Sequence, residues 1–279
     1  MDKSVGQKFD HGHALILSGG PGRTGAARLA ARGALRIGAG LVTLGVPPPA
    51  QMEVASHITA LMLKRVSNAD GLNAVLEDDR INALCLGPGL GLDHDAASLV
   101  ETVLGAGHLR LTRHVVFDAD ALTLIARDPA RMAALNAHAV LTPHGGEFAR
   151  LFPDIAEKLA AVPDRGPAYS KVDATRDAAA RCGAVVLFKG PDTVIAHPDG
   201  RVSIHAAAYD RKAPWLATAG AGDVLAGFIT GLLARGSDPL EAAETAAWLH
   251  VECARQFGPG LIAEDLPEIL PQVLRRLLD

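Results

Sequence analysis

A run of small residues that ends in an acid is the segment of this chain best suited to chemistry. Residues 218–222 read Thr-Ala-Gly-Ala-Gly, Asp223 follows, and an apolar helical pattern begins directly after it. Small residues let a backbone approach a ligand closely, and the first turn of a helix offers unpaired N–H groups with a partial positive charge. The run therefore predicts a phosphate or oxyanion site. Because a carboxylate repels phosphate, Asp223 is interpreted as a proton acceptor, or as a contact with the molecule that is phosphorylated.

Two other segments combine polar side chains with glycine. Residues 142–147 read Thr-Pro-His-Gly-Gly-Glu. His144 could hydrogen-bond a phosphate or amide, and Glu147 could hold Mg²⁺ through water, but a surface histidine and a helix-start glutamate explain the pair equally well. Residues 189–193 read Lys-Gly-Pro-Asp-Thr. Lys189 and Thr193 could meet nucleotide phosphates, and a plain hairpin turn is the structural alternative.

Two glycine-rich loops and a pair of acids are less specific. Residues 19–25 lack both the ending of a P-loop and the acidic partner of a dinucleotide fingerprint, and a tight turn explains them as well. Residues 87–91, Gly-Pro-Gly-Leu-Gly, could pack against phosphate or ribose or simply turn the chain. Asp118 and Asp120 follow an apolar strand; Asp120 is predicted to cap a helix that begins near Ala121, and Asp118 is kept as a ligand contact.

The elements that must position these residues alternate between apolar strands and helical patterns. Continuous apolar strands separated by helices predict an α/β fold, with a mostly parallel central sheet covered by helices on both faces. Strands are expected at 14–17, 41–46, 83–86, 114–117 and 139–141, with a first helix at about 26–37. Three strands in quick succession, 185–188, 193–196 and 202–205, predict a small antiparallel addition, and helices dominate from 223 onward. Residues 1–279 are interpreted as one domain.

Each polar or glycine-rich loop follows the C-terminal end of an expected strand, which is the edge where open α/β sheets bind ligands. The convergence of several such loops is a stronger signal than any loop alone.

Composition excludes several classes of protein. Of the 279 residues, 49% are hydrophobic and 21% charged, as in a well-buried globular protein. A net charge of −4 and 4% aromatic residues argue against nucleic-acid binding. Neither a membrane-spanning apolar run nor a secretory leader is visible, so we expect a cytoplasmic protein that binds no membrane. The cysteines Cys85, Cys182 and Cys253 lie far apart, so neither disulfides nor structural zinc are expected, and Cys85 is predicted to be a core residue.

Seven motifs together resemble the NAD(P)H-hydrate dehydratase family, the repair enzymes of the YjeF C-terminal type within the ribokinase-like superfamily. They occur in family order and span nearly the whole chain. The motifs are SGGPGRTGAARL at 18–29, GAGLVT at 38–43, LGPGLG at 86–91, VFDADAL at 116–122, LTPHGGEF at 141–148, LFKGPDTV at 187–194 and ATAGAGDVLAG at 217–227. One departure is Ala221, where the family motif Gly-Gly-Thr-Gly-Asp has a threonine whose hydroxyl could contact phosphate. Many relatives also carry an N-terminal epimerase domain, which this sequence does not display, so a standalone protein and a part of a longer one both remain open.

The resemblance implies a ribokinase-like fold and a repair reaction. The family restores NADH or NADPH from forms hydrated at carbon 6 of the nicotinamide ring. ADP or ATP phosphorylates the 6-hydroxyl in the presence of Mg²⁺, and phosphate then leaves. Bacterial-type relatives favour ADP, and relatives form tetramers. A kinase for a small hydroxylated molecule, such as a vitamin precursor, is the nearest alternative, and a non-catalytic nucleotide sensor is a more distant one.

The family roles transfer to matching positions of this sequence. Asp223 is the implied base, and the backbone N–H groups of Gly220, Ala221 and Gly222 would stabilise the transferring phosphoryl group. Glu147 would help to hold Mg²⁺. The implied nucleotide contacts are Gly222, Lys189, Gly190, Pro191, Asp192 and Thr193. The implied contacts with the hydrated dinucleotide are Ala26, Gly89, Asp118, His144 and Asp223.

Overall fold

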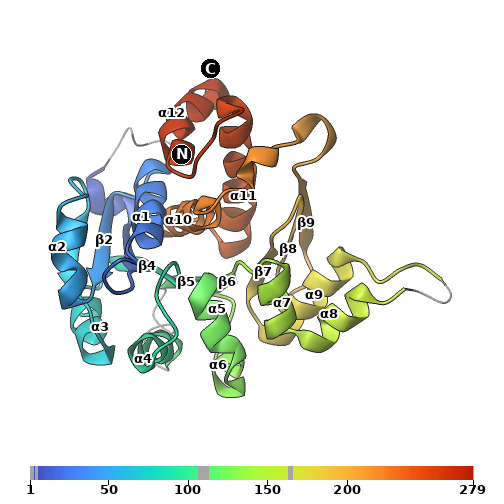
Figure 1. The fold of residues 1–279 in the computed structure, drawn as a ribbon, viewed down its shortest axis with the longest axis horizontal. Helices are drawn as coiled ribbons and strands as arrows, with labels where there is room; N and C mark the ends of the chain where they lie inside the picture. Colours follow the sequence, from blue (N-terminus) through green and yellow to red (C-terminus); the bar gives the residue numbers. More distant parts are fainter. Residues whose placement is uncertain (1–2, 4–5, 106–112, 163–165, 279) are drawn as a thin grey trace.

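A single twisted sheet organises the protein. The computed structural model describes residue 3 and residues 6–105, 113–162 and 166–278. Within them nine strands form one sheet in the order β3-β2-β1-β4-β5-β6-β7-β8-β9 (Figure 1). The strands are β1 His13–Leu17, β2 Leu41–Val46, β3 Met62–Arg65, β4 Ile81–Leu86, β5 His114–Phe117, β6 Ala139–Leu141, β7 Val185–Phe188, β8 Asp192–Ala196 and β9 Val202–Ala206.

The predicted sheet is confirmed, with one strand added. All neighbours from β3 to β7 pair in parallel, whereas β7–β8 and β8–β9 are antiparallel. Sequence reasoning missed β3, because this edge strand is largely exposed and ends in Lys64 and Arg65. Edge strands often carry such charged residues, which discourage pairing with another chain, and they lack the apolar run that identified the others.

Helices cover both faces of the sheet. Figure 1 shows α1, α10, α11 and α12 on one side and α3 to α9 on the other. The helices are α1 Gly25–Arg36, α2 Gln51–Ala55, α3 Ala69–Leu76, α4 His94–Leu104, α5 Ala119–Ala126, α6 Pro129–Ala133, α7 Gly145–Leu151, α8 Pro153–Ala160, α9 Lys171–Cys182, α10 Ala221–Ala234, α11 Pro239–Phe257 and α12 Asp265–Leu278. Short 3₁₀ turns lie at Lys8–His11, Pro48–Ala50, Tyr209–Arg211 and Pro214–Leu216. Among the described helices, none is both long and apolar enough to cross a membrane.

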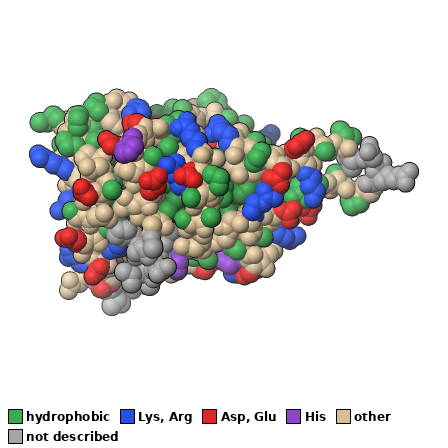
Figure 2. All heavy atoms as spheres, turned by 90° about the horizontal axis from the view of Figure 1, so that it is seen from below, with side chains coloured by type: hydrophobic (Ala, Val, Ile, Leu, Met, Phe, Trp, Pro, Cys, Tyr) green, Lys and Arg blue, Asp and Glu red, His purple; other side chains and the backbone are tan. Residues whose placement is uncertain are grey.

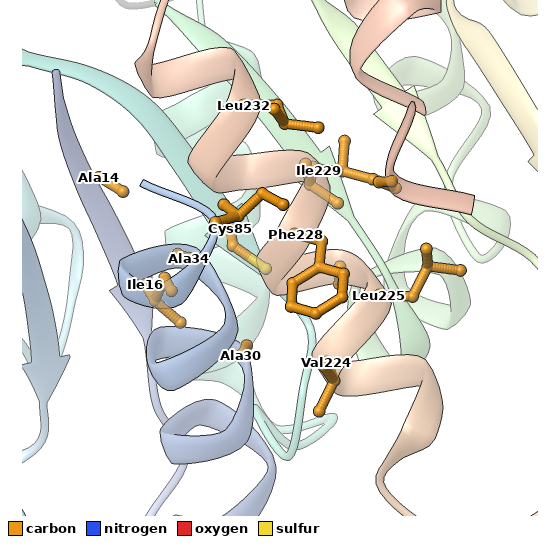
Figure 3. Close-up of a cluster of buried hydrophobic side chains, with 14 of the residues drawn as sticks. Ala14, Ile16, Ala30, Ala34, Cys85, Val224, Leu225, Phe228, Ile229 and Leu232 are labelled. Atoms are coloured by element: carbon orange, nitrogen blue, oxygen red, sulfur yellow. The ribbon is translucent and has the colours of Figure 1, made fainter. Parts of the chain in front are cut away.

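The alternation of side chains along the strands divides the interior into two cores. In β1, Ile16 belongs to the core beneath α1 and α10, while Leu15 belongs to the core on the opposite face. Figure 3 shows the first of these cores, where Phe228 of α10 lies among side chains of α1 and of the central strands. Cys85 is fully buried in the same core, as predicted.

Helices α1 and α10 touch backbone to backbone. A Cβ atom on Gly227 would lie 2.1 Å from the carbonyl oxygen of Ala30, and one on Gly231 would lie 2.6 Å from that of Ala34. Only glycine permits such an approach. The position of the α10 N-terminus is therefore fixed by close contact with α1.

Candidate active site

The loops that follow the parallel strands meet at the C-terminal edge of the sheet, as predicted. A Cβ atom on Gly19 would lie 1.8 Å from the carbonyl oxygen of Gly89, and one on Gly87 would lie 1.6 Å from that of Asp118. A Cβ atom on Gly89 itself would lie 3.5 Å from the Ala26 side chain. The glycines thus bring the loops after β1, β4 and β5 into direct contact.

Lys189, directly after β7, is the centre of a buried charge cluster. Its Nζ lies 2.8 Å from Asp118 Oδ1 and 3.9 Å from Glu147 Oε2. Thr142 donates its hydroxyl to the same Asp118 oxygen at 2.7 Å. Burial alone would lower the pKa of Lys189, but the carboxylates of Asp118 and Glu147 raise it overall. The lysine therefore remains a cation held among acids.

Asp223 lies near this cation, in the first turn of α10. Burial, reinforced by the negative charge of Asp118, raises the pKa of Asp223 to about 7, although Lys189 opposes the shift. The loop is close to the lysine, since a Cβ atom on Gly222 would lie 3.5 Å from Lys189 Nζ. A carboxylate that titrates near neutrality beside a cation has the properties of a general base.

The α10 N-terminus has the geometry of an anion site. Gly220 enters the helix in the left-handed region, with φ +89°, and Val224 donates the first helical hydrogen bond, to the Gly220 carbonyl oxygen at 3.1 Å. The N–H groups of Gly222 and Asp223 precede that bond and point toward the helix start. The Ala221 N–H makes only a long contact of 3.4 Å with Thr218 O. The helix begins at Ala221, so Asp223 lies within it.

His250 of α11 supports this turn and was missed from the sequence. Its Nε2 lies 2.8 Å from the Ala221 carbonyl oxygen, and burial lowers its pKa to about 4, so the neutral ring donates. A lone histidine on an apolar helix gave no signal of its partner 29 residues away. The Ala221 side chain is itself buried in the core, so a threonine hydroxyl at this position would lie inside the protein.

His144 and Glu147 form the N-terminal cap of α7. His144 Nδ1 accepts from Gly146 N at 3.0 Å, and Glu147 Oε2 accepts from His144 N at 2.8 Å. The helix-start reading is therefore confirmed, and a ligand role stays a prediction. Within the described residues, no three His, Cys, Asp or Glu side chains are grouped to hold a metal. A single buried carboxylate fits Mg²⁺ that is bound mostly by water and phosphate oxygens.

Asp120 does not cap a helix, so that prediction was wrong. Helix α5 begins at Ala119, which has φ +46°. This conformation costs an alanine about 1–2 kcal/mol. Asp120 lies in the first turn, where its Oδ2 accepts from Gly91 N at 2.8 Å. The carboxylate therefore fastens the loop at 87–91, while Asp118 is turned toward Lys189.

Residues 190–193 comprise the end of the turn between β7 and β8 and the first two residues of β8, and their contacts lie apart from the charge cluster. Lys171 of α9 donates to the Asp192 carbonyl oxygen at 2.6 Å, and Thr193 donates to the Gly190 carbonyl oxygen at 3.0 Å. The Pro191 carbonyl oxygen accepts from Ala207 N at 2.6 Å. The hairpin alternative is thus correct as a description of structure, and nucleotide contact stays a prediction.

Comparison with protein families and curated proteins gives a consistent result. The family model described as NAD(P)H-hydrate dehydratase matches residues 14–272. A bifunctional NAD(P)H-hydrate repair enzyme of Moorella thermoacetica is 39% identical over 99% of this chain and 51% of its own length. An ADP-dependent (S)-NAD(P)H-hydrate dehydratase of Xanthomonas campestris is 32% identical over 98% of this chain and 91% of its own. The chain spans about half the length of the bifunctional relatives that it matches.

Solved structures agree with these sequence matches. The ADP/ATP-dependent NAD(P)H-hydrate dehydratase of Bacillus subtilis, co-crystallised with ATP and Mg²⁺, superposes with a TM-score of 0.77 at 28% identity, covering 99% of this chain and 93% of its own. A ribokinase-like superfamily protein of Enterococcus faecalis superposes with a TM-score of 0.81 at 21% identity, covering 99% and 91%. The predicted ribokinase-like fold is confirmed.

Proposed function

The chain belongs to the NAD(P)H-hydrate dehydratase family, and on that premise we propose that it converts hydrated NADH or NADPH back to the reduced dinucleotide at the expense of ADP or ATP. The observation that carries the proposal is Asp223, an acid with a pKa of about 7 at the anion-binding start of α10. Phosphorylation suits the chemistry, because hydroxide is a poor leaving group and phosphate a good one.

The first proposed step is phosphoryl transfer. Asp223 accepts the proton of the 6-hydroxyl as that oxygen attacks the terminal phosphorus. The bond from phosphorus to the bridging oxygen breaks and releases AMP from ADP, or ADP from ATP. The N–H groups of Gly220, Ala221 and Gly222, together with the Lys189 cation, stabilise charge on the transferring phosphoryl oxygens.

The second proposed step is elimination. The lone pair of the ring nitrogen expels phosphate from carbon 6, and loss of a proton from carbon 5 then restores the double bond. This chain contributes by keeping the ring in place: Ala26, Gly89 and His144 line the dinucleotide side. Because Lys189 and Thr142 both bind Asp118 Oδ1, we assign the substrate contact of Asp118 to Oδ2.

The donor nucleotide occupies the opposite side of Lys189 in this proposal. Gly222 and residues 189–193 contact its phosphates, and Glu147 holds Mg²⁺ through water. Bound there, the ion neutralises charge on the phosphate oxygens. We favour ADP as the donor, in line with the ADP-dependent relative from Xanthomonas campestris. We also propose that the protein forms a homotetramer, which light scattering can measure. We place it in the cytoplasm, where its nucleotide substrates occur.

One assay tests the reaction. Hydrated NADH is mixed with Mg²⁺, the protein and either ADP or ATP, and absorbance of the reduced nicotinamide is followed. Recovery of absorbance with release of AMP or ADP supports the dehydratase. A phosphorylated product without recovery would instead identify a small-molecule kinase. The absence of both would leave a nucleotide sensor and would contradict the proposal.

A further inference from the structure

A basic groove runs beside α1, outside the residues assigned above. It encloses about 680 Å³ between α1, the segment from His57 to Leu61 and the region around Glu264 and Pro271. A volume of this size is typical of small-molecule sites. Three arginines of α1, Arg28, Arg32 and Arg36, line it. Their spacing of four residues places them on one face of the helix.

Two of these arginines already have a partner. Glu268 of α12 binds Arg32 Nε at 2.6 Å through Oε1 and Arg36 Nη2 at 2.6 Å through Oε2. Both arginines are about half exposed, and exposed pairs of this kind contribute little to stability. The single carboxylate offsets only one of these two positive charges, so this part of the groove stays basic.

Arg28 differs from both. Its Nε is buried and has no hydrogen-bond partner within the described part of the chain. Hydrogen bonds to its carboxylate lower the pKa of Glu53, and the positive charge of Arg28 helps to lower it further. The Glu53 oxygens, however, already accept from Gly22 N at 2.8 Å and from Thr24 Oγ1 at 2.5 Å. Arg28 as a whole is half-buried and lines the groove, so a ligand there meets a guanidinium group whose Nε has no acceptor of its own. A phosphate oxygen is the acceptor that guanidinium groups bind best.

The groove lies next to the loops of the reaction centre. Gly25 lines it, and the next residue, Ala26, packs against the Gly89 loop. Leu29 also lines it, and its Cδ1 would lie 2.7 Å from a Cβ atom on Gly220. A molecule that extends from the Asp223 loop past Ala26 would therefore reach the Gly25 end of this groove.

We propose that the groove is a phosphate subsite for the hydrated dinucleotide and that Arg28 is its main anchor. The proposal rests on the dehydratase function. It concerns the pyrophosphate or the 2′-phosphate of the substrate, both of which are phosphate esters remote from the reacting ring. Glu264 also lines the groove. Its negative charge repels a phosphate group and weakens the binding of that group.

The test uses binding as well as turnover. Dissociation constants of NADPH and NADH are measured by nicotinamide fluorescence for the wild type, Arg28→Met, Arg28→Lys and Glu264→Gln. Arg127→Met is the matched control, because Arg127 is exposed after α5 on the opposite face of the sheet. Loss of a charge-assisted bond predicts at least about tenfold weaker binding for Arg28→Met, with partial recovery in Arg28→Lys. Glu264→Gln should bind more tightly than the wild type.

The outcomes separate the sources of the phosphate. Weakening confined to NADPH identifies the 2′-phosphate, and equal weakening of both identifies the pyrophosphate. In the repair assay the KM of the hydrated dinucleotide should rise while that of ADP stays constant. Unchanged dinucleotide binding in both Arg28 variants and in Glu264→Gln would overturn the proposal. If the wild type binds NADPH without repairing its hydrate, the dehydratase proposal fails while the subsite is still tested.

Discussion

Asp118 and Asp223 both lie near Lys189, and their surroundings differ sharply. Asp118 is buried and binds Lys189 and Thr142 through one oxygen, at 2.8 and 2.7 Å. Asp223 lies in the first turn of α10, and burial beside other acids raises its pKa to about 7. One carboxylate is thus committed to holding a cation in place, and the other is left ready to take a proton. Neighbouring groups, rather than residue type, separate these two tasks.

Asp223→Asn should cause the largest loss of turnover, because it removes the carboxylate that differs from Asp118. The amide keeps the shape but cannot accept the hydroxyl proton, so we expect kcat to fall by about 10³-fold or more. The midpoint of thermal unfolding should stay equal or rise, because a poorly compensated buried charge is removed. Turnover near the wild-type value would rule out Asp223 as the base.

Lys189→Met tests the cation that both acids share. Asp118 would lose its partner while remaining buried, which predicts a loss of roughly 3 kcal/mol in the free energy of unfolding. Turnover should fall by about 100-fold as the phosphoryl group loses a positive contact. Chemical denaturation and steady-state kinetics measure the two effects. Lys64→Met is the matched control, because Lys64 is exposed on the edge strand β3; equal losses in both variants would contradict the special role of Lys189.

The pH dependence of activity and stability should reveal the ionisation of Asp223. Since the base must be ionised, kcat/KM should rise about tenfold per pH unit below pH 7 and level off above it. The raised pKa also affects stability with a defined sign: the folded state holds the proton up to about pH 7, whereas the unfolded state loses it near pH 4. Between these values the wild type should lose stability relative to Asp223→Asn as pH rises. A pH-independent difference between the two unfolding curves would argue against the raised pKa.

His250→Asn should give the smallest change in turnover. It tests how far His250 supports the loop at the start of α10. The hydrogen bond to Ala221 O at 2.8 Å is buried, and loss of such a bond typically costs about 1–3 kcal/mol. We expect turnover to fall less than about tenfold, because no reacting atom is touched. Kinetics with ADP at saturation checks this value. A loss as large as that of Asp223→Asn would mean that His250 takes part in the chemistry.

Much of this architecture could be predicted from the sequence, because apolar runs and glycine spacing are local signals. The strands, the loops at their C-terminal ends and the helix after Gly220 follow from them. Contacts between distant residues do not. The bond of Asp120 to Gly91, the pairing of His250 with Ala221 and the bare Nε of Arg28 depend on positions that only the fold brings together. The span of one domain over residues 1–279 stays a prediction, and a single cooperative unfolding transition would support it.

Net charge does not reveal how charges are distributed over the surface. On the face drawn in Figure 2, basic side chains are interspersed with acidic ones over the described surface. The basic groove described above is instead a local feature of one helix face, which a chain-wide charge of −4 conceals.

The backbone contact between α1 and α10 has a geometric consequence. Gly227 and Gly231 pack α10 closely against Ala30 and Ala34, so the position of one helix sets the position of the other. The base is carried by one helix and the arginine face by the other. From Gly25 to Arg36 that face extends roughly 16 Å, at 1.5 Å per residue. The fold therefore holds the base and the arginines at a set separation, which favours a ligand long enough to contact both.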